Sequence, residues 1–246
     1  MRAALPFRAL GPIDARSVGR ESMLAWLLPL PLVLGVVVRF AWPPLEVALG
    51  DQLGTEMAAY RELLASYCFV MLTPLLVGFV TGFLLLDERD DHTFTALLVT
   101  PLSLESYLLY RIGAPLLVCT AMSLVALAIS GLASVSWPSL IAIQLMAALE
   151  GPIIALLLAS LADDKVRGFA VMKAMQAVML VPVVAWFIDP PLQWAAGLIP
   201  TYWPLRAYWS AGQPGPGFGI ALGAGFAVHL GLLAWLLGRF RRLMHR

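Results

Sequence analysis

Apolar residues fall into six long runs along the chain, and short polar segments separate these runs. Each run has about 20 residues or more, which is the length that an α-helix needs to cross a hydrocarbon core of about 30 Å. The predicted spans cover residues 23–42, 63–86, 104–131, 139–161, 168–188 and 218–237. The pattern predicts an all-α integral membrane protein in which residues 1–246 form one transmembrane domain.

Three polar segments are expected at the membrane surfaces. Residues 1–22 place four arginines among apolar residues, which is typical of a helix lying on anionic lipid. Residues 43–62 are charged and are placed outside the bilayer. Residues 189–217 are rich in proline and aromatic residues, and we expect short amphipathic helices there, at the outer interface. The aromatic residues are Trp194, Tyr202, Trp203, Tyr208 and Trp209.

The longest polar interruption lies between the second and third spans, at residues 87–103. A carboxylate costs about 3 kcal/mol in hydrocarbon on insertion scales, so the acidic first part must lie in water. Residues 93–100 have the spacing of a short amphipathic helix that ends before Pro101, and Ser103 is placed to cap the third span. The segment is either a solvated turn or a coupling loop that docks on a soluble protein. The candidate coupling residues are Asp87, Glu88, Arg89, Asp90, Asp91, His92, Thr93, Phe94, Leu97, Leu98 and Pro101.

Composition agrees with a membrane protein. The chain is 61% hydrophobic and only 13% charged, whereas soluble domains have about 25% charged residues. If both termini lie in the cytoplasm, Arg39, Arg61 and Arg206 are the only ones of the 16 Lys and Arg on the outer side. The positive-inside rule therefore favours cytoplasmic termini and a cytoplasmic 87–103 loop. No basic patch carries interleaved aromatic residues, so a nucleic acid partner is not expected.

Sequence motifs for catalysis on this chain are absent. There is no glycine-rich phosphate loop, so any ATP that drives the protein, with its Mg²⁺, must be hydrolysed on another chain. The histidines are far apart in sequence and form no zinc motif, so neither a metal site nor a directly bound cofactor is predicted. Cys68 and Cys119 lie inside apolar runs and are interpreted as small buried residues.

Two ionisable residues, Glu150 and His229, lie near the middle of predicted spans. Such residues are functional candidates, and they either pair with each other or line a polar path for a solute. Packing without a further role is the alternative. A stripe on the fifth span offers a second candidate for the path, although helix packing also explains it. The residues of this stripe are Met172, Met175, Gln176 and Met179.

The run Thr95-Ala96-Leu97-Leu98-Val99-Thr100-Pro101-Leu102-Ser103, which follows the acidic cluster Asp87-Glu88-Arg89, resembles the cytoplasmic loop of ABC type 2 exporter permeases. His92-Thr93 stands where that family usually has Gly-Thr, and Arg111 stands where it usually has a lysine. The segments Gly11-Pro12-Ile13-Asp14 and Arg20-Glu21, with Pro29 and Arg39, are similar to those of permeases that export fluoroquinolones.

The resemblance implies a permease subunit of the prokaryotic cytoplasmic membrane. In that family the loop helix, here residues 93–100, docks into a cleft on a separate ABC ATPase subunit, and two permeases, identical or related, flank the pathway. The expected function is outward transport of a hydrophobic or amphipathic compound, a drug-like molecule or a lipid, by alternating access. The second and fifth spans are the family's expected pathway helices.

Three alternatives remain open from the sequence. A haem-exporter-type permease shares the six-span plan. A membrane scaffold would have no ATPase partner. An intramembrane protease would need a serine near a histidine, and Ser130-Gly131 with His229 resembles the rhomboid pair only weakly, because Ala128 stands where that family has glycine.

Overall fold

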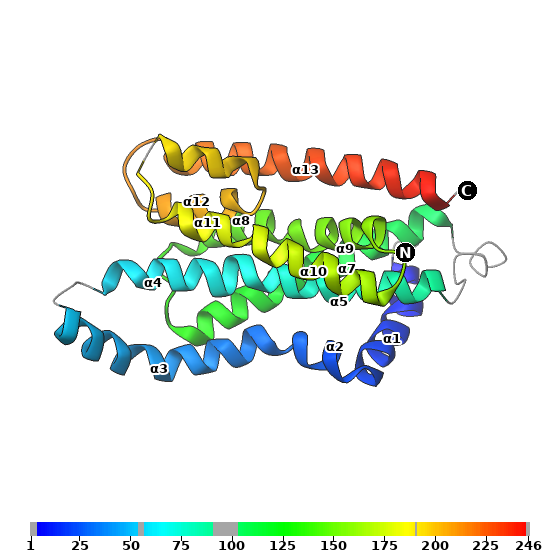
Figure 1. The fold of residues 1–246 in the computed structure, drawn as a ribbon, viewed down its shortest axis with the longest axis horizontal. Coiled ribbons are helices and arrows are strands. Elements are labelled where there is room, and N and C mark those ends of the chain that lie inside the picture. Colours follow the sequence, from blue (N-terminus) through cyan, green and yellow to red (C-terminus); the bar gives the residue numbers. More distant parts are fainter. Residues whose placement is uncertain (1–3, 54–56, 91–102, 190, 245–246) are drawn as a thin grey trace.

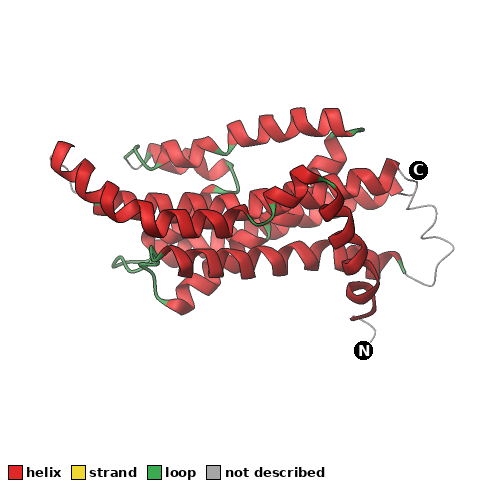
Figure 2. Cartoon of the chain, turned by 90° about the horizontal axis from the view of Figure 1, so that it is seen from below, coloured by secondary structure: helices red, strands yellow, loops and turns green. Residues whose placement is uncertain are grey.

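The computed structural model describes residues 4–53, 57–90, 103–189 and 191–244, and every regular element among them is a helix (Figure 2). Six helical stretches are long and apolar enough to cross a bilayer. These are Ser22–Gln52, Tyr60–Asp90, Glu105–Ser130, Trp137–Leu161, Lys165–Ala185 and Gly217–Phe240. The predicted all-α fold with six spans is confirmed.

The spans run side by side along the long axis of the molecule (Figure 1). Helix α1 (Ala4–Arg20) lies across them at one end, beside the end of α5 (Leu72–Asp90) and the start of α7 (Leu104–Ser130) (Figures 1 and 2). Helix α12 (Tyr202–Ser210) lies at the other end of the bundle. We call these the α1 end and the α12 end.

Helices α5 and α9 (Glu150–Leu161) form the tightest packing in the bundle. Gly78 and Gly82, one turn apart on α5, face α9, and a Cβ on Gly78 would lie 2.9 Å from the Gly151 carbonyl oxygen. Glycines at this spacing let two backbones approach closely, which strengthens dispersion contacts where lipid provides no hydrophobic drive. The second span is consequently almost enclosed by its neighbours.

The first span combines α2 (Ser22–Leu27) with α3 (Leu30–Leu53), and it meets α7 at the α12 end. A Cβ on Gly35 would lie 2.7 Å from the Ala126 carbonyl oxygen. Arg39 Nη1 donates to the Ile129 carbonyl oxygen at 3.2 Å, so this arginine caps α7. The predicted end of this span at Trp42 is wrong, because α3 continues through Pro43 and Pro44 to Leu53.

The second span also starts earlier than predicted, with α4 (Ala58–Ala65) and a π-helical turn, η1 (Ser66–Met71), ahead of α5. Pro74 follows that turn and has no N–H to donate to the preceding turn of helix. Insertion of a π-turn is one way in which a helix accommodates such a gap. The helix therefore changes type locally just before Pro74.

The fourth and fifth spans are each broken near the middle. Leu149 separates helix α8 (Trp137–Ala148) from α9, which begins at Glu150, and Pro152 has no N–H to donate to the preceding turn. Helix α10 (Lys165–Val178) is followed by α11 (Leu180–Ala185), which contains Pro182. A missing backbone bond at each proline explains both breaks.

The aromatic segment near the α12 end is helical, as expected, in η2 (Leu192–Leu198) and α12. Tyr202, Tyr208 and Trp209 are at most 3% exposed, so these three side chains are buried in the protein and do not contact lipid headgroups. Trp209 Nε1 donates to Ser66 Oγ at 2.9 Å, so α12 packs against the π-helical turn η1. Sequence alone does not distinguish aromatic residues in lipid headgroups from aromatic residues in a protein core.

The polar segment at residues 87–103 begins within a helix. Asp87, Glu88, Arg89 and Asp90 form the last turn of α5, so the prediction that the second span ends at Leu86 is wrong. Ser103 caps α7, as predicted, by accepting a hydrogen bond from the Ser106 N–H at 3.2 Å. Helix α13 (Gly217–Met244) completes the bundle and returns the chain to the α1 end (Figure 1).

Candidate functional site

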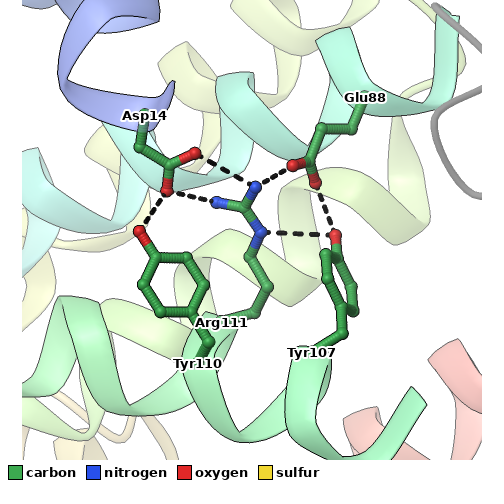
Figure 3. A network of polar contacts seen from close by, with 5 residues as sticks. All are labelled: Asp14, Glu88, Tyr107, Tyr110 and Arg111. Atoms are coloured by element: carbon green, nitrogen blue, oxygen red, sulfur yellow. Dashed lines mark hydrogen bonds and ion pairs between the residues drawn. The ribbon is translucent and has the colours of Figure 1, made fainter. Parts of the chain in front are cut away.

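Arg111 is the centre of a polar network at the α1 end (Figure 3). Its guanidinium donates to both oxygens of Asp14, at 2.8 and 3.2 Å, and it also bonds Glu88. Nε donates to the Tyr107 hydroxyl at 3.3 Å. Tyr110 donates to Asp14 at 2.7 Å, and Tyr107 donates to Glu88. One arginine of α7 therefore joins the N-terminal helix to the end of α5.

Burial makes this network more than a surface contact. The Arg111 side chain is only 3% exposed, against 19% for Asp14 and 16% for Glu88. A buried charge is tolerated when its hydrogen-bonding groups are paired, and each of the three guanidinium nitrogens makes at least one hydrogen bond in this network. Helix spacing explains the arrangement, because Tyr107, Tyr110 and Arg111 lie within one turn of α7.

Lys165 forms a second ion-pair cluster at the α1 end. It bonds Glu21, between α1 and α2, and its Nζ lies 2.8 Å from Asp87 Oδ1 at the end of α5. The lysine is the first residue of α10, which Asp164 caps by accepting from the Arg167 N–H at 2.8 Å. This cluster is more exposed than the Arg111 network, at 39% for the lysine side chain.

Arg89 supplies a third connection. Its guanidinium donates to the carbonyl oxygens of Ala159, at 3.4 Å, and Ala162, at 2.8 Å, at the end of α9. The cation satisfies carbonyl groups that the helix leaves without a partner. The last turn of α5 carries three acidic residues, which interact unfavourably with the negative end of the helix dipole. Arg89, Arg111 and Lys165 provide the compensating positive charge.

The three connections surround the start of the predicted coupling loop. Asp87, Glu88 and Arg89 are bonded to α10, α7 and α9, respectively, and Asp90 is the exposed last residue of α5. The remaining coupling candidates lie outside the described residues. They are Asp91, His92, Thr93, Phe94, Leu97, Leu98 and Pro101.

Glu150 and His229, candidates for the substrate path, lie next to each other. His229 Nε2 is 3.3 Å from Glu150 Oε1, and His229 Nδ1 is 2.7 Å from the Gly225 carbonyl oxygen. Both side chains are at most 3% exposed, and Glu150 Oε2 has no hydrogen-bond partner among the described residues. The pair joins the start of α9 to the middle of α13.

The stripe on the fifth span divides between two environments. Met172 and Met175 pack against α5 and α9 in the bundle. Gln176 and Met179 line a pocket of about 290 Å³, together with Tyr67, Met71 and Leu75 of the second span. A second pocket, of about 330 Å³, shares Tyr67 and Leu180 with the first and continues toward Trp42.

The geometry does not assemble the serine protease pair. Ser130 Oγ donates to the Leu127 carbonyl oxygen at 2.7 Å and accepts from the Leu132 N–H, so it closes the end of α7. His229 is engaged with Gly225 and Glu150 instead. In the described part of the chain, no group of three or more His, Cys, Asp and Glu side chains could hold a metal ion.

Several residues of these networks share a helix face, but that spacing alone does not identify them as site residues. Asp14 and Glu21 are seven residues apart and thus lie on one face of a helical N-terminus. Tyr107, Tyr110 and Arg111 also share a face. These spacings were the available signal, but the partner of each charge lies up to 144 residues away, as for Lys165 and Glu21.

Six apolar helices with ionic networks at one end and buried ionisable residues inside define a multi-pass membrane protein. The family described as Fluoroquinolones export permease protein Rv2686c-like matches residues 14–237. Two proteins of Mycobacterium tuberculosis, named Fluoroquinolones export permease protein MT2760 and Rv2686c, are each 30% identical over 240 residues, covering 96% of this chain and 94% of theirs.

The chain therefore belongs to the Rv2686c-like family of fluoroquinolone export permeases. It is a transmembrane permease subunit of a drug exporter.

Proposed function

We propose that this permease exports amphipathic drugs of the fluoroquinolone type, powered by a separate ABC ATPase that binds the 87–103 loop. ATP and Mg²⁺ bind that partner, and a second permease copy completes the pathway. The names of the two mycobacterial relatives support the substrate class. The absence of a phosphate loop from the sequence supports an ATPase on another chain.

The connection between loop and spans is the observation that carries the coupling proposal. A movement imposed on a loop reaches the pathway only through a rigid element. Glu88 and Arg111 join the helix that enters the loop to the helix that leaves it, and Asp14 holds α1 against both. A force on the loop would thus move α1, α5 and α7 together rather than bend one helix end.

The charge distribution supports cytoplasmic termini in the cytoplasmic membrane of a prokaryote. Arg89, Arg111, Lys165 and Arg167 lie at the α1 end with both ends of the chain, whereas Arg206 lies on α12 at the other end (Figure 1). Positive residues are retained on the cytoplasmic side, so the α1 end is cytoplasmic. The loop then faces the compartment that contains ATP.

The face shared by the second and fifth spans is the proposed outer part of the pathway. Its two pockets share Tyr67 and Leu180. The wall of the pocket near Trp42 is apolar, whereas the pocket lined by Gln176 also exposes polar surface. Methionine side chains such as Met179 adapt to ligands of different shape. A second permease copy packed on this face would convert the open pockets into an enclosed path.

The test is co-purification of the protein with its ATPase from the host, followed by mass spectrometry. Leu97→Asp places a charge on the proposed docking face and should abolish the association, because an apolar contact would have to bury a carboxylate. Leu198→Asp is the matched control, since Leu198 is 89% exposed at the α12 end. Retention of the ATPase by both variants would refute docking through the loop.

Transport provides the second readout. Cells that carry the protein and its ATPase should accumulate less of a fluorescent fluoroquinolone than cells with the Leu97→Asp variant. The two strains should accumulate equal amounts once ATP is depleted. Equal accumulation with ATP present would argue against the export function.

A further inference from the structure

A cavity of about 460 Å³ lies between α1, α5 and α7, on the opposite side of α5 from the pockets near the fifth span. Asp14, Tyr110 and Arg111 form its polar end, and Val80, Leu84 and Ala114 belong to its apolar wall. Cavities that hold small amphipathic molecules have this volume and this division between one polar end and apolar walls.

The cavity adjoins the membrane side of the bundle. Leu117 and Val118 line it, and they are also 59% and 36% exposed on α7. Gly35 and Arg39 hold the first span to α7 toward the α12 end, and Leu28, after the end of α2, forms the facing wall of the cavity. An apolar molecule can thus reach the cavity from the half of the bilayer next to the α1 end.

The polar end carries an excess of negative charge. Two carboxylates, Asp14 and Glu88, share one guanidinium, that of Arg111. Asp14 Oδ2 accepts from Tyr110 and from Arg111, whereas Oδ1 accepts only from Arg111 among the described contacts. A carboxylate oxygen accepts two hydrogen bonds, so Oδ1 can accept one more from a ligand.

We propose that this cavity is a binding site for an amphipathic compound with a protonated amine, which donates to Asp14 while its apolar body lies against α5 and α7. The compound is the transported drug, entering from the cytoplasmic half of the bilayer. A headgroup with negative charge and no amine is disfavoured, because it would offer Asp14 no donor and would add a negative charge beside two carboxylates and one arginine.

This proposal rests on the proposed export function and adds an entry site to it. It also links substrate to motor, because the ligand would contact Asp14, which belongs to the network at the base of the coupling loop. A bound amine would therefore change the contacts of the residues that hold α1, α5 and α7 together. Drug binding should consequently stimulate the partner ATPase through this network.

The test is binding of norfloxacin to the purified protein in nanodiscs of phosphatidylcholine and phosphatidylglycerol, followed by fluorescence anisotropy. Ala114→Phe fills the cavity and should weaken binding at least tenfold. Ala128→Phe makes the same change at an exposed position near the other end of α7 and should leave the affinity within twofold. Equal affinity of both variants would overturn the proposal.

The amine is tested separately with N-acetylated norfloxacin, which cannot carry the piperazine charge. The wild-type protein should bind this probe at least tenfold more weakly than norfloxacin, and Asp14→Asn should remove most of that difference. Retained discrimination in Asp14→Asn would place the amine elsewhere. If phosphatidylethanolamine in the nanodiscs displaces norfloxacin completely, the site is a lipid site and its assignment to the drug is wrong.

The norfloxacin-binding experiment and the ATPase co-purification experiment can fail independently of each other. Ala114→Phe should still co-purify with the ATPase, because the substituted residue lies within the cavity and not on the loop. Loss of norfloxacin binding with the ATPase retained supports the cavity. A wild-type protein that binds norfloxacin but no ATPase would instead contradict the motor while leaving the binding site intact.

Discussion

Asp14 and Arg111 are 97 residues apart in the sequence, yet two hydrogen bonds of 2.8 and 3.2 Å join their side chains. This contact fastens the N-terminal helix to the third span at the base of the coupling loop. The N-terminal helix is therefore part of the force-bearing end of the molecule. Its contacts with α7 hold α1 across the spans. The segment remains helical although Gly11 and Pro12 fall within it.

Replacing Arg111 by methionine should destabilise the protein by about 3–5 kcal/mol, because Asp14 and Glu88 would remain close together without a cation. Unfolding in denaturant, followed by tryptophan fluorescence in detergent, measures this change. Arg242→Met is the control, since Arg242 is exposed and bonds only to Gly238 in the described structure. Similar stabilities for the two variants would mean that the network contributes little.

Lys165→Gln should cost no more than about 1 kcal/mol, because the lysine is 39% exposed and solvent screens its two ion pairs. The difference from the wild-type protein should shrink as salt is added. Lys173→Gln, on the same helix at an exposed position, provides the baseline. A loss as large as that of Arg111→Met would show that the two networks are equally important.

Gly78→Ala should destabilise the bundle by about 1–3 kcal/mol, since the added methyl group would meet the Gly151 backbone and Ile154. Gly223→Ala on α13 has open space around the new atom and should be neutral or stabilising. Thermal unfolding of the two variants tests the close packing of α5 on α9. Unchanged stability in Gly78→Ala would contradict that packing.

His229→Ala should cost about 3–5 kcal/mol, because Glu150 would then be buried without its partner. Glu150→Gln retains a hydrogen-bonding group and should be milder. Fluoroquinolone accumulation in cells distinguishes path from packing: a stable Glu150→Gln variant with reduced export supports a polar path. If Glu150→Gln shows normal export and normal stability, Glu150 does not line a polar path, and its pairing with His229 does not require a charge.

Trp209→Phe should lose about 1–3 kcal/mol, since the buried Ser66 hydroxyl would lose its indole donor. Trp235→Phe is the matched control, because Trp235 is 53% exposed on α13. Denaturant unfolding of both variants measures the contribution of α12 to the core. Equal stabilities of the two variants would mean that Trp209 contributes no more to the core than the exposed Trp235.

The sequence by itself determined the class of fold. Six apolar runs are sufficient to predict six spans, because a bilayer leaves few ways to satisfy the backbone other than a helix of about 20 residues. It also located the helix cap at Ser103, since a cap depends on residues within one turn. The acidic cluster after Leu86 identified the loop on which the coupling proposal depends.

Only the tertiary structure decided which charges meet. Asp14, Glu88 and Arg111 come from three separate helices, and the distance between them depends on how those helices cross, which helix periodicity does not specify. The same limit applies to Tyr208 and Trp209, whose burial follows from the π-helical turn and α8 packing against α12. Local interactions fix where a helix begins and ends, whereas side-chain partners and cavities depend on packing between distant segments.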